Sequence, residues 1–398
     1  MKTVYLDHNA TTPVREEVLE AMFAIYRGVT GNPSSIHAFG RAARKEVEAG
    51  RAKVAAAIGA KPEEIVFTGG GTEADNLAIL GVAFANRKRG NHIITSAIEH
   101  HAVLHACRFL EKEGFSVTYL PVSGEGLVDP KELANEIRPE TILITVMTAN
   151  NEIGVIQPVE EIGEIAKARG VVFHTDAIQA LGKIPFSVEK TEAGLAALSA
   201  HKVYGPKGVG ALYVRRGVRL QPLTYGGHHE RGKRPGTENV AGIVGFGRAC
   251  ELALAELTAE ADRLRLLRDR LCSDISKKIS HVKLNGAPGK RLPNTLNMSF
   301  EFVEGEGILL GLEMSGIAAA SGSACTSGEL TPSHVLSAMG VPAALAQGSI
   351  RFSLGRENTL EDILGTVEVL IPVVRRLRLM SPFYDGSQDG TGTGGDTR

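Results

Sequence analysis

The sequence predicts an α/β protein with a large domain built around a mostly parallel sheet and a smaller α+β domain. Short apolar runs with the composition of strands alternate with helical patterns through the first half of the chain, which is typical of right-handed βαβ units. The chain has 398 residues, 43% of them hydrophobic, and this is enough for two cores. Glycines cluster where expected strands pass into helices, as turns in such a fold require.

The expected elements follow in order along the chain. Strands are expected at residues 4–6, 64–68, 92–96, 117–120, 141–147, from 171 onward, 209–214, 294–300, 317–320 and 350–353. Helices are expected at 13–26, 38–58, from 72 onward, around 105, 158–168, 239–279, 306–315, 331–339 and 360–379. We place the large domain at 14–258 and the small domain at 1–13 and 259–383. The tail 384–398 has nothing apolar to bury and is expected to be disordered.

Composition and charge argue against several classes of function. Basic residues number 44 against 45 acidic ones, so there is no electrostatic case for nucleic acid or an anionic membrane as a partner. The N-terminus has no apolar stretch long enough for a signal peptide or a membrane span. The four cysteines form no CxxC pair, which argues against a zinc ribbon or a thioredoxin-type site, and nothing in the sequence suggests a disulfide framework. A reducing cytoplasm is therefore the expected location.

Polar groups at two expected strand ends carry the central chemistry. An apolar run from Val171 leads to His174-Thr175-Asp176, with Gln179 shortly after, and a second run ends at Ser199-Ala200-His201-Lys202. Open α/β sheets place ligands at the carboxyl ends of strands, so an acid and a lysine delivered in this way can meet around one ligand. Pyridoxal phosphate needs a lysine for its aldehyde and a carboxylate for its pyridinium nitrogen. The alternative is a buried Asp and a surface Lys with nothing between them.

A glycine turn offers an anion site. The strand at 64–68 breaks at Gly69-Gly70-Gly71 and a helix restarts at Thr72, so backbone N–H groups and the helix dipole face one point. The turn is neither a P-loop nor a dinucleotide fingerprint, and a plain strand-to-helix turn has the same pattern. The basic, glycine-rich loop 226–237 is expected either to be solvated or to reach a phosphate, including one in a neighbouring subunit.

Histidines allow two interpretations. His100 follows an expected strand, where an imidazole can stack on a flat cofactor and move protons. His101 and His105 stand at i,i+4 spacing, and His228 and His229 are adjacent, which suggests a metalloprotein as an alternative. No HExxH motif surrounds them, so we expect no metal held by protein ligands alone.

One cysteine differs from the others in its setting. Cys325 lies among serine, glycine and threonine residues, whereas Cys107, Cys250 and Cys272 stand beside apolar residues in helical patterns. A thiol in such a mobile, exposed setting suggests a nucleophile, and an incidental loop thiol is the alternative. Arg351 stands at the end of Gly348-Ser349-Ile350-Arg351 and can bind a substrate carboxylate or form a structural ion pair.

Together these motifs resemble the cysteine desulfurases of the NifS/IscS class, which belong to the class-V aminotransferases and the fold-type-I pyridoxal-phosphate enzymes. The motifs cover the chain up to about Pro382. They are Tyr5-Leu6-Asp7, Asn9–Thr12, Gly31–Ser35, Thr72–Asn76, Glu99-His100, Ala149–Gly154, His174–Gln179, Ser199–Lys202, Arg231–Asn239, Arg291–Asn294, Ser321–Gly328 and Gly348–Arg356. Two features depart from the usual pattern: Gly69-Gly70-Gly71 is richer in glycine, and His8 stands where asparagine is common.

The resemblance implies an aspartate aminotransferase-like fold, with a seven-stranded sheet between helices, and gives each site residue a role. Lys202 would form the Schiff base with pyridoxal 5'-phosphate, Cys325 would attack the substrate sulfur, and His100 would stack on the ring and move thiol protons. Asp176 would pair with the pyridinium nitrogen and Gln179 with the phenolic oxygen. The phosphate would be held by Gly71, Thr72, Ser199, His201 and, from the second subunit of a homodimer, Thr237. The residues implied for substrate binding are Asn151, Arg351 and Asn32.

The implied activity converts L-cysteine to L-alanine, with the sulfur passing to Cys325 as a persulfide and then to an acceptor for iron–sulfur cluster assembly. The implied partners are a second copy of the chain and a NifU- or IscU-like scaffold, whose cluster Cys325 would contact transiently. A selenocysteine lyase, another fold-type-I pyridoxal-phosphate enzyme and a non-catalytic sulfur carrier are the alternatives.

Overall fold

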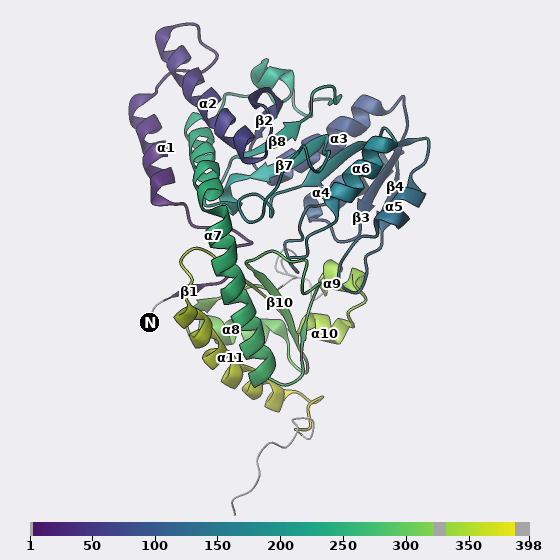
Figure 1. Ribbon diagram of the computed structural model, residues 1–398, viewed down its shortest axis with the longest axis vertical. Coiled ribbons are helices and arrows are strands. Elements are labelled where there is room, and N and C mark those ends of the chain that lie inside the picture. The colour runs from purple at the N-terminus through teal and green to yellow at the C-terminus, as the bar shows by residue number, and fades with distance from the viewer. Residues whose placement is uncertain (1–2, 322–331, 387–398) are drawn as a thin grey trace, which may run out of the picture.

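The computed structural model describes residues 3–321 and 332–386. Seven strands form its large sheet: β2 (Ile65–Thr68), β3 (His92–Ser96), β4 (Ser116–Leu120), β5 (Thr141–Thr145), β6 (Val172–Asp176), β7 (Leu195–Ser199) and β8 (Gly210–Val214). Their order across the sheet is β2-β8-β7-β6-β5-β3-β4. Figure 1 labels β2, β8 and β7 on one side of the sheet and β3 and β4 on the other. β8 is antiparallel to both neighbours and every other pair is parallel. The predicted mostly parallel, seven-stranded sheet is confirmed.

Helices cover both faces of this sheet, because successive side chains of a strand point to opposite faces. Ile65 and Phe67 pack with α1 (Glu16–Gly28), α2 (Ala38–Ala57) and the first part of α7 (Val240–Lys278). Val66, between them, packs on the other side with α3 (Gly71–Asn86) and α4 (His101–Lys112). Farther along the sheet, α5 (Pro130–Glu136) and α6 (Val159–Ala168) cover Phe173 of the central strand β6. His174, the next residue of β6, therefore faces α3.

The first helix begins later than the sequence predicts. The expected start was Pro13, whereas α1 begins at Glu16. The residues before it stay extended because their N–H groups bond to the turn that carries Lys202: Thr12 N donates to His201 O at 2.9 Å and Arg15 N to Tyr204 O at 3.2 Å. The N-terminal segment is thereby fastened alongside the strand ends.

The smaller part of the protein holds the remaining strands and helices. They are β1 (Val4–Tyr5), β9 (Val282–Leu284), β10 (Thr295–Phe300), β11 (Ile317–Ala318), β12 (Ser349–Ser353), α8 (Gly305–Glu313), α9 (His334–Ala338), α10 (Ala343–Gln347) and α11 (Leu360–Met380). β1 pairs in parallel with β11, and β12-β10-β9 form an antiparallel sheet.

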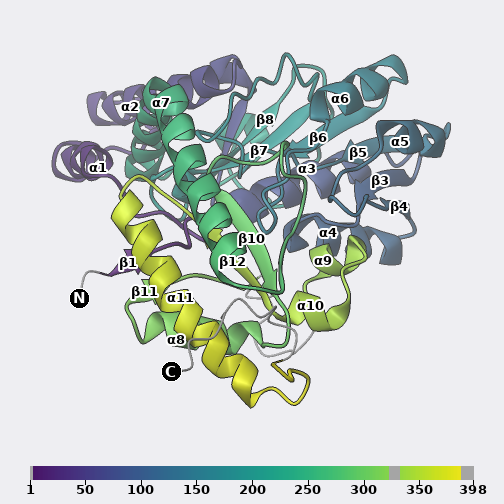
Figure 2. The same ribbon diagram turned by 60° about the horizontal axis from the view of Figure 1, so that its bottom comes forward.

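The long helix α7 joins the two parts, and Figure 2 shows α11 beside its second half. Phe246 of α7 packs in the core under the large sheet, whereas Leu271 packs in the second core with Leu6, β10, β12, α8 and α11. The domain boundaries given above stay predictions. Most of the predicted disordered tail, from residue 387 on, and Cys325 lie outside the described residues. No helix in the described part of the chain is long and apolar enough to cross a membrane.

Candidate active site

A cavity of about 420 Å³ lies where β5, β6 and β7 end, and the N-terminal segment forms part of its wall. Ten of the predicted site residues line it: Gly71, Thr72, His100, Asn151, Asp176, Gln179, Ser199, His201, Lys202 and Arg351. The structure thus gathers side chains that are widely separated in the sequence. Their individual roles stay predictions.

Lys202 enters the cavity from the short 3-10 helix η2 (Ala200–Lys202), directly after β7. Its Nζ donates to Asn9 O and to Ala10 O, each at 2.7 Å. The amine therefore lies next to the N-terminal segment, at the end of a flexible side chain that lines the cavity.

Asp176 ends β6, the parallel strand next to β7, and only 6% of its surface is exposed. Its Oδ1 accepts a hydrogen bond from Ile178 N at 2.9 Å. Burial raises the pKa of Asp176 to about 6, while that N–H group and the charge of Lys202 act in the other direction. The carboxyl is ionised at neutral pH and can pair with a protonated ring nitrogen.

The N-terminus of α3 forms another part of the wall. A Cβ on Gly71 would lie 2.2 Å from Ile178 Cδ1 and 3.4 Å from Ser199 Cβ, so a larger residue there would require the Ile178 side chain to move. The Ser199 hydroxyl is buried, and among the described residues its Oγ has no hydrogen-bond partner. An unmatched hydroxyl beside the first N–H groups of a 16-residue helix is a setting that fits a phosphate.

His100 caps the N-terminus of α4, and its Nδ1 accepts a hydrogen bond from Ala102 N at 3.1 Å. Burial, and then the positive charge of Lys202, lowers the pKa of His100 to about 4. The ring is therefore neutral at pH 7, and with Nδ1 acting as acceptor its proton lies on Nε2. This arrangement makes His100 a hydrogen-bond donor toward the cavity.

Arg351 reaches the cavity from β12 of the smaller part. Its Nη2 donates to Asp7 Oδ1 at 2.6 Å and its Nη1 to Asn151 O at 3.2 Å. Its Nε is buried without a hydrogen-bond partner among the described residues. A guanidinium with an unused donor can take a carboxylate from a ligand.

Residues 4–365 match the model of the family described as Aminotransferase class-V. A curated relative from Dictyoglomus turgidum, named Cysteine desulfurase IscS, is 55% identical over 382 residues, which are 96% of this chain and 97% of the relative. A relative of the same name from Methanosarcina thermophila is also 55% identical, over 96% of this chain and 94% of its own length. The chain belongs to the cysteine desulfurases of the class-V aminotransferase family.

A solved structure agrees with this assignment. A protein described as NIFS-LIKE PROTEIN is 42% identical, with a TM-score of 0.89 over 94% of this chain and 100% of its own. The desulfurase therefore has the fold of the NifS-like enzymes, which are pyridoxal-phosphate enzymes, as the resemblance implied.

Sequence reasoning missed a residue at the centre of the desulfurase cavity. Asn9 O accepts hydrogen bonds from Gln179 Nε2 at 3.0 Å and from Lys202 Nζ. Asn9 Oδ1 accepts from Lys183 Nζ at 3.2 Å and from Asn294 Nδ2 at 3.0 Å. Asn9 stands in a motif that carries the family resemblance, but the motif does not say that its backbone and side chain connect both parts of the protein.

Three predicted site residues do not line the cavity of this chain. Asn32 is exposed, and its Oδ1 accepts from Ser34 N at 2.9 Å in the turn before α2. Thr237 is exposed in the basic loop, consistent with a contribution to another subunit but not a test of one. Cys325 lies outside the described residues, but residues before and after it contact Arg351 and Glu152, the neighbour of Asn151. Ala320 pairs with the backbone of Arg351, and Ser333 Oγ donates to Glu152 Oε2 at 2.5 Å.

The three described cysteines are poor nucleophiles. Cys107 and Cys250 are buried and Cys272 is half-buried. Burial raises the pKa of Cys107 to about 12 and also raises the pKa of the other two thiols. A thiol that stays protonated does not attack sulfur readily, so Cys325 is the candidate by elimination as well as by motif.

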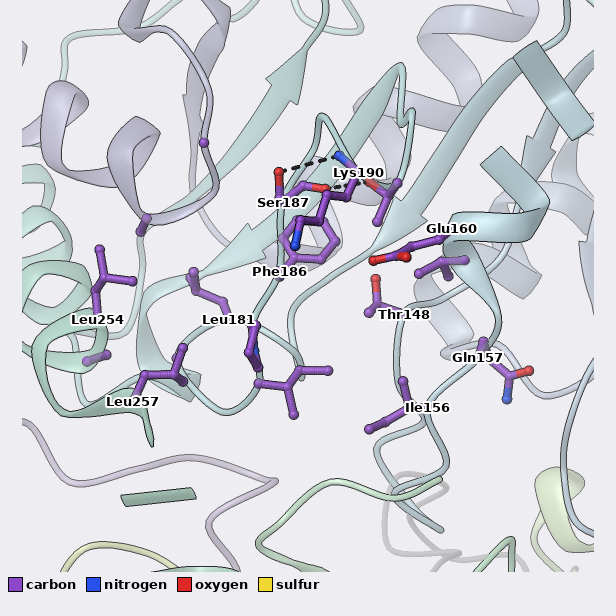
Figure 3. A pocket seen from close by; sticks show the side chains of 18 of the residues that line it. Thr148, Ile156, Gln157, Glu160, Leu181, Phe186, Ser187, Lys190, Leu254 and Leu257 are labelled. Atoms are coloured by element: carbon purple, nitrogen blue, oxygen red, sulfur yellow. Dashed lines mark hydrogen bonds between the residues drawn. The ribbon is translucent and has the colours of Figure 1, made fainter. Parts of the chain in front are cut away.

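A second cavity, of about 580 Å³, lies between α2, α6 and α7 and is lined mainly by apolar groups. Figure 3 shows Leu181, Phe186, Leu254 and Leu257 around it. It contains none of the predicted site residues. In residues 3–321 and 332–386 no group of three or more His, Cys, Asp or Glu side chains is arranged to hold a metal ion.

Proposed function

We propose that the chain binds pyridoxal 5'-phosphate in the 420 Å³ cavity and uses it to convert L-cysteine to L-alanine, with Cys325 receiving the sulfur. The observation that carries this proposal is the meeting of Lys202, Asp176 and the N-terminus of α3 in one cavity. Pyridoxal phosphate has an aldehyde, a ring nitrogen and a phosphate, and these three protein groups are complementary to them.

The remaining polar groups of the cavity suit the rest of the cofactor. Ser199 Oγ, Thr72 and His201 would bind the phosphate together with the N–H groups of α3. Gln179 Nε2 donates one hydrogen to Asn9 O, and its second N–H would donate to the phenolic oxygen. His100 would stack on the ring, since it is neutral and fixed by its contact with Ala102 N.

When bound, the cofactor supplies an electron-withdrawing ring that stabilises negative charge on the substrate Cα. The ionised carboxylate of Asp176 would keep the ring nitrogen protonated. Lys202 Nζ would accept the proton of Cα and return a proton at the end of the reaction. His100 carries its proton on Nε2, so it is arranged to donate; accepting a thiol proton there would require the other tautomer.

Arg351 and Asn151 would orient the substrate through its carboxylate. Both line the cavity and are joined by the hydrogen bond from Arg351 Nη1 to Asn151 O. A solved relative described as SspA in complex with cysteine is 39% identical, with a TM-score of 0.79 over 88% of this chain and 99% of its own. It supports cysteine as the ligand of this cavity.

The chain length between Ala320 and Cys325 allows the thiol to approach the substrate. Cys325 follows Ala320 by five residues, a stretch that spans at most ~18 Å, and Ala320 is bonded to Arg351 in the cavity wall. In the transfer step the Cys325 thiolate forms a bond to the substrate sulfur, and the substrate C–S bond breaks. The electron pair of that bond stays on the substrate carbon, which takes up a proton to become the methyl group of alanine.

The proposal includes partners and a location. Thr237 would reach the phosphate of a second copy in a homodimer, and the persulfide sulfur would pass to a NifU- or IscU-like scaffold for iron–sulfur cluster assembly. The cytoplasm is the compartment we expect. The curated relatives named IscS support the role in sulfur supply.

The test is an absorbance spectrum of the purified protein before and after L-cysteine, with sulfide and alanine measured together. We expect a visible band that L-cysteine changes, and equal amounts of sulfur and alanine. Lys202→Ala should lose the band of the resting protein. Cys325→Ala should keep the band and its response but release no sulfide, whereas the matched control Cys272→Ala should turn over normally. Normal turnover by Cys325→Ala would reject the nucleophile and favour a lyase that needs no thiol.

A further inference from the structure

Two buried side chains with unused hydrogen-bonding atoms face each other between α3 and β6, the elements that carry Thr72 and Asp176. They are Asp75 of α3 and His174 of β6, and neither side chain has any exposed surface. Among the described residues neither carboxyl oxygen of Asp75 has a hydrogen-bond partner, nor does His174 Nε2. Asp75 Oδ1 lies 3.6 Å from His174 Nε2, so these unmatched atoms are near neighbours.

An ionised Asp75 would be costly at this position. A buried carboxylate without hydrogen bonds loses its hydration and gains nothing in return. It would also repel Asp176, because His174 and Asp176 are two residues apart on β6 and point to the same face, toward α3. Glu99 is a third fully buried carboxyl in this region, held by Ser96 Oγ and by the backbone of Met147.

The contacts of His174 suggest where a proton would go. Its Nδ1 lies 2.8 Å from Thr145 Oγ1. If Nδ1 carries the ring proton and donates it to that hydroxyl, Nε2 has a lone pair directed toward Asp75. A protonated carboxyl at Asp75 would then supply the donor that Nε2 lacks, in a hydrogen bond between neutral partners that forms when the two atoms close from 3.6 Å to hydrogen-bond distance.

We propose that Asp75 is a neutral carboxylic acid that donates its proton to His174 Nε2, and that this pair is a positioning device that leaves Asp176 as the ionised carboxylate of the cavity. The part concerning Asp176 rests on the proposed cofactor site. The state of Asp75 itself does not.

The electrostatic surroundings agree with the geometry. Burial, and then the charges of Asp176 and Glu99, raises the pKa of Asp75 well above its usual range. Burial lowers the pKa of His174 to about 3, which disfavours a charged pair. Burial also raises the pKa of Glu99 to about 8. Of these three carboxyls, only Asp176 has both an N–H donor, from Ile178, and a nearby cation, Lys202. The ionised form is therefore most favourable at Asp176.

The test is a difference infrared spectrum of protein labelled with ¹³C-aspartate, wild type minus Asp75→Asn, at pH 8. Asparagine keeps the shape and can donate to His174 Nε2. We expect the variant to lose a protonated carboxyl band, in both the protein as purified and the protein freed of cofactor. Asp262→Asn is the matched control, since Asp262 is exposed and paired with Arg265; it should lose a carboxylate band instead. Loss of a carboxylate band in Asp75→Asn would overturn the proposal.

A second measurement covers the positioning role. We expect Asp75→Asn to bind pyridoxal phosphate within twofold of wild type, with an unchanged pH midpoint for its visible absorbance. Asp75→Leu leaves His174 Nε2 without a donor, and we expect at least fivefold weaker binding. A midpoint shifted by one pH unit or more in Asp75→Asn would mean that Asp75 carries charge, and unchanged binding in Asp75→Leu would remove the positioning role. Absence of any cofactor binding by wild type would instead refute the proposed function, and the spectrum of cofactor-free protein would still decide the state of Asp75.

Discussion

Arg351 Nη2 donates to Asp7 Oδ1 across 2.6 Å, which joins the start of the chain to the last strand of the small sheet. The Arg351 side chain is 6% exposed and that of Asp7 is 22% exposed. The guanidinium that we expect to bind the substrate carboxylate therefore already has an acidic partner. A substrate must either share Arg351 with Asp7 or replace it.

The first prediction concerns Asp7→Asn. Removing the charge leaves a buried guanidinium unpaired, so we expect the free energy of unfolding without substrate to fall by about 1–3 kcal/mol. A ligand carboxylate should then restore the missing partner. L-alanine should accordingly raise the melting temperature of the variant more than that of wild type, as measured by thermal unfolding of the cofactor-loaded protein.

The control is Asp262→Asn, which removes an exposed ion pair with Arg265 and should change the free energy of unfolding by no more than about 0.5 kcal/mol. If Asp7→Asn responds less to L-alanine than wild type does, Asp7 orients Arg351 for the substrate and does not compete with it.

The second prediction concerns Lys183, which no motif or local pattern in the sequence marks as part of the site. Its Nζ donates to Gln179 Oε1 and, at 3.2 Å, to Asn9 Oδ1. Lys183, charged or neutral, donates to the oxygen of the Gln179 amide. The NH₂ group of that amide is therefore turned toward Asn9 O. Burial, and then the charges of Lys202 and Arg351, lowers the pKa of Lys183 well below its usual range.

Lys183→Met should let the Gln179 amide rotate and should weaken binding of pyridoxal phosphate about fivefold to tenfold, the worth of one hydrogen bond. Fluorescence titration of cofactor-free protein measures this. In a Gln179→Ala background the same substitution should have little further effect. An equal loss in both backgrounds would show that Lys183 acts without Gln179.

The third prediction concerns pH. Burial raises the pKa of Asp176 to about 6, so this carboxyl takes up a proton as the pH falls through that value. A protonated Asp176 cannot pair with a pyridinium nitrogen, so the affinity for pyridoxal phosphate should be complete above pH 7 and should decline below pH 6. Asp176→Asn should bind weakly at every pH and lose the dependence. An Asp176→Asn protein that keeps the wild-type pH profile would assign the titration to another group.

The sequence predicted those parts of the site whose chemistry is local. Asp176 and Lys202 each end an apolar run, and parallel strands carry their ends to one edge, so their meeting follows from the fold class. Thr72 could be predicted in the same way, because the glycine turn before it lies where a strand ends and a helix begins. Asn9 and Asp7 were different, because their partners are Gln179, Lys202 and Arg351, and no local pattern records contacts over such distances.

The start of α1 could not be predicted for a similar reason. Pro13 is a favourable first residue of a helix, but the N–H groups of Thr12 and Arg15 bond to the turn around Lys202, and this tertiary contact keeps the segment extended. The contact between Asp75 and His174 could not be predicted either, because nothing in the two motifs that contain these residues indicates that their side chains meet.

The last prediction concerns the basic loop that carries Thr237. Glu230 of this loop is buried and accepts from Arg51 Nη1 and Nη2 at 2.7 and 2.8 Å, and from Phe67 N at 2.8 Å. It adopts a left-handed backbone with φ of 46°, which the pairing holds in place. Glu230→Gln leaves Arg51 without its buried partner and should lower the free energy of unfolding by about 3 kcal/mol in urea.

The effect should depend on the pair. In an Arg51→Met background, Glu230→Gln should cost much less, because no unpaired guanidinium remains. Lys53→Met is the matched control, since its ion pair with Glu251 is exposed and should contribute little. If Thr237 reaches the phosphate of a second subunit, Glu230→Gln should also weaken cofactor binding at temperatures where the protein is folded. Unchanged cofactor binding in a destabilised Glu230→Gln protein would mean that this anchor supports the fold alone.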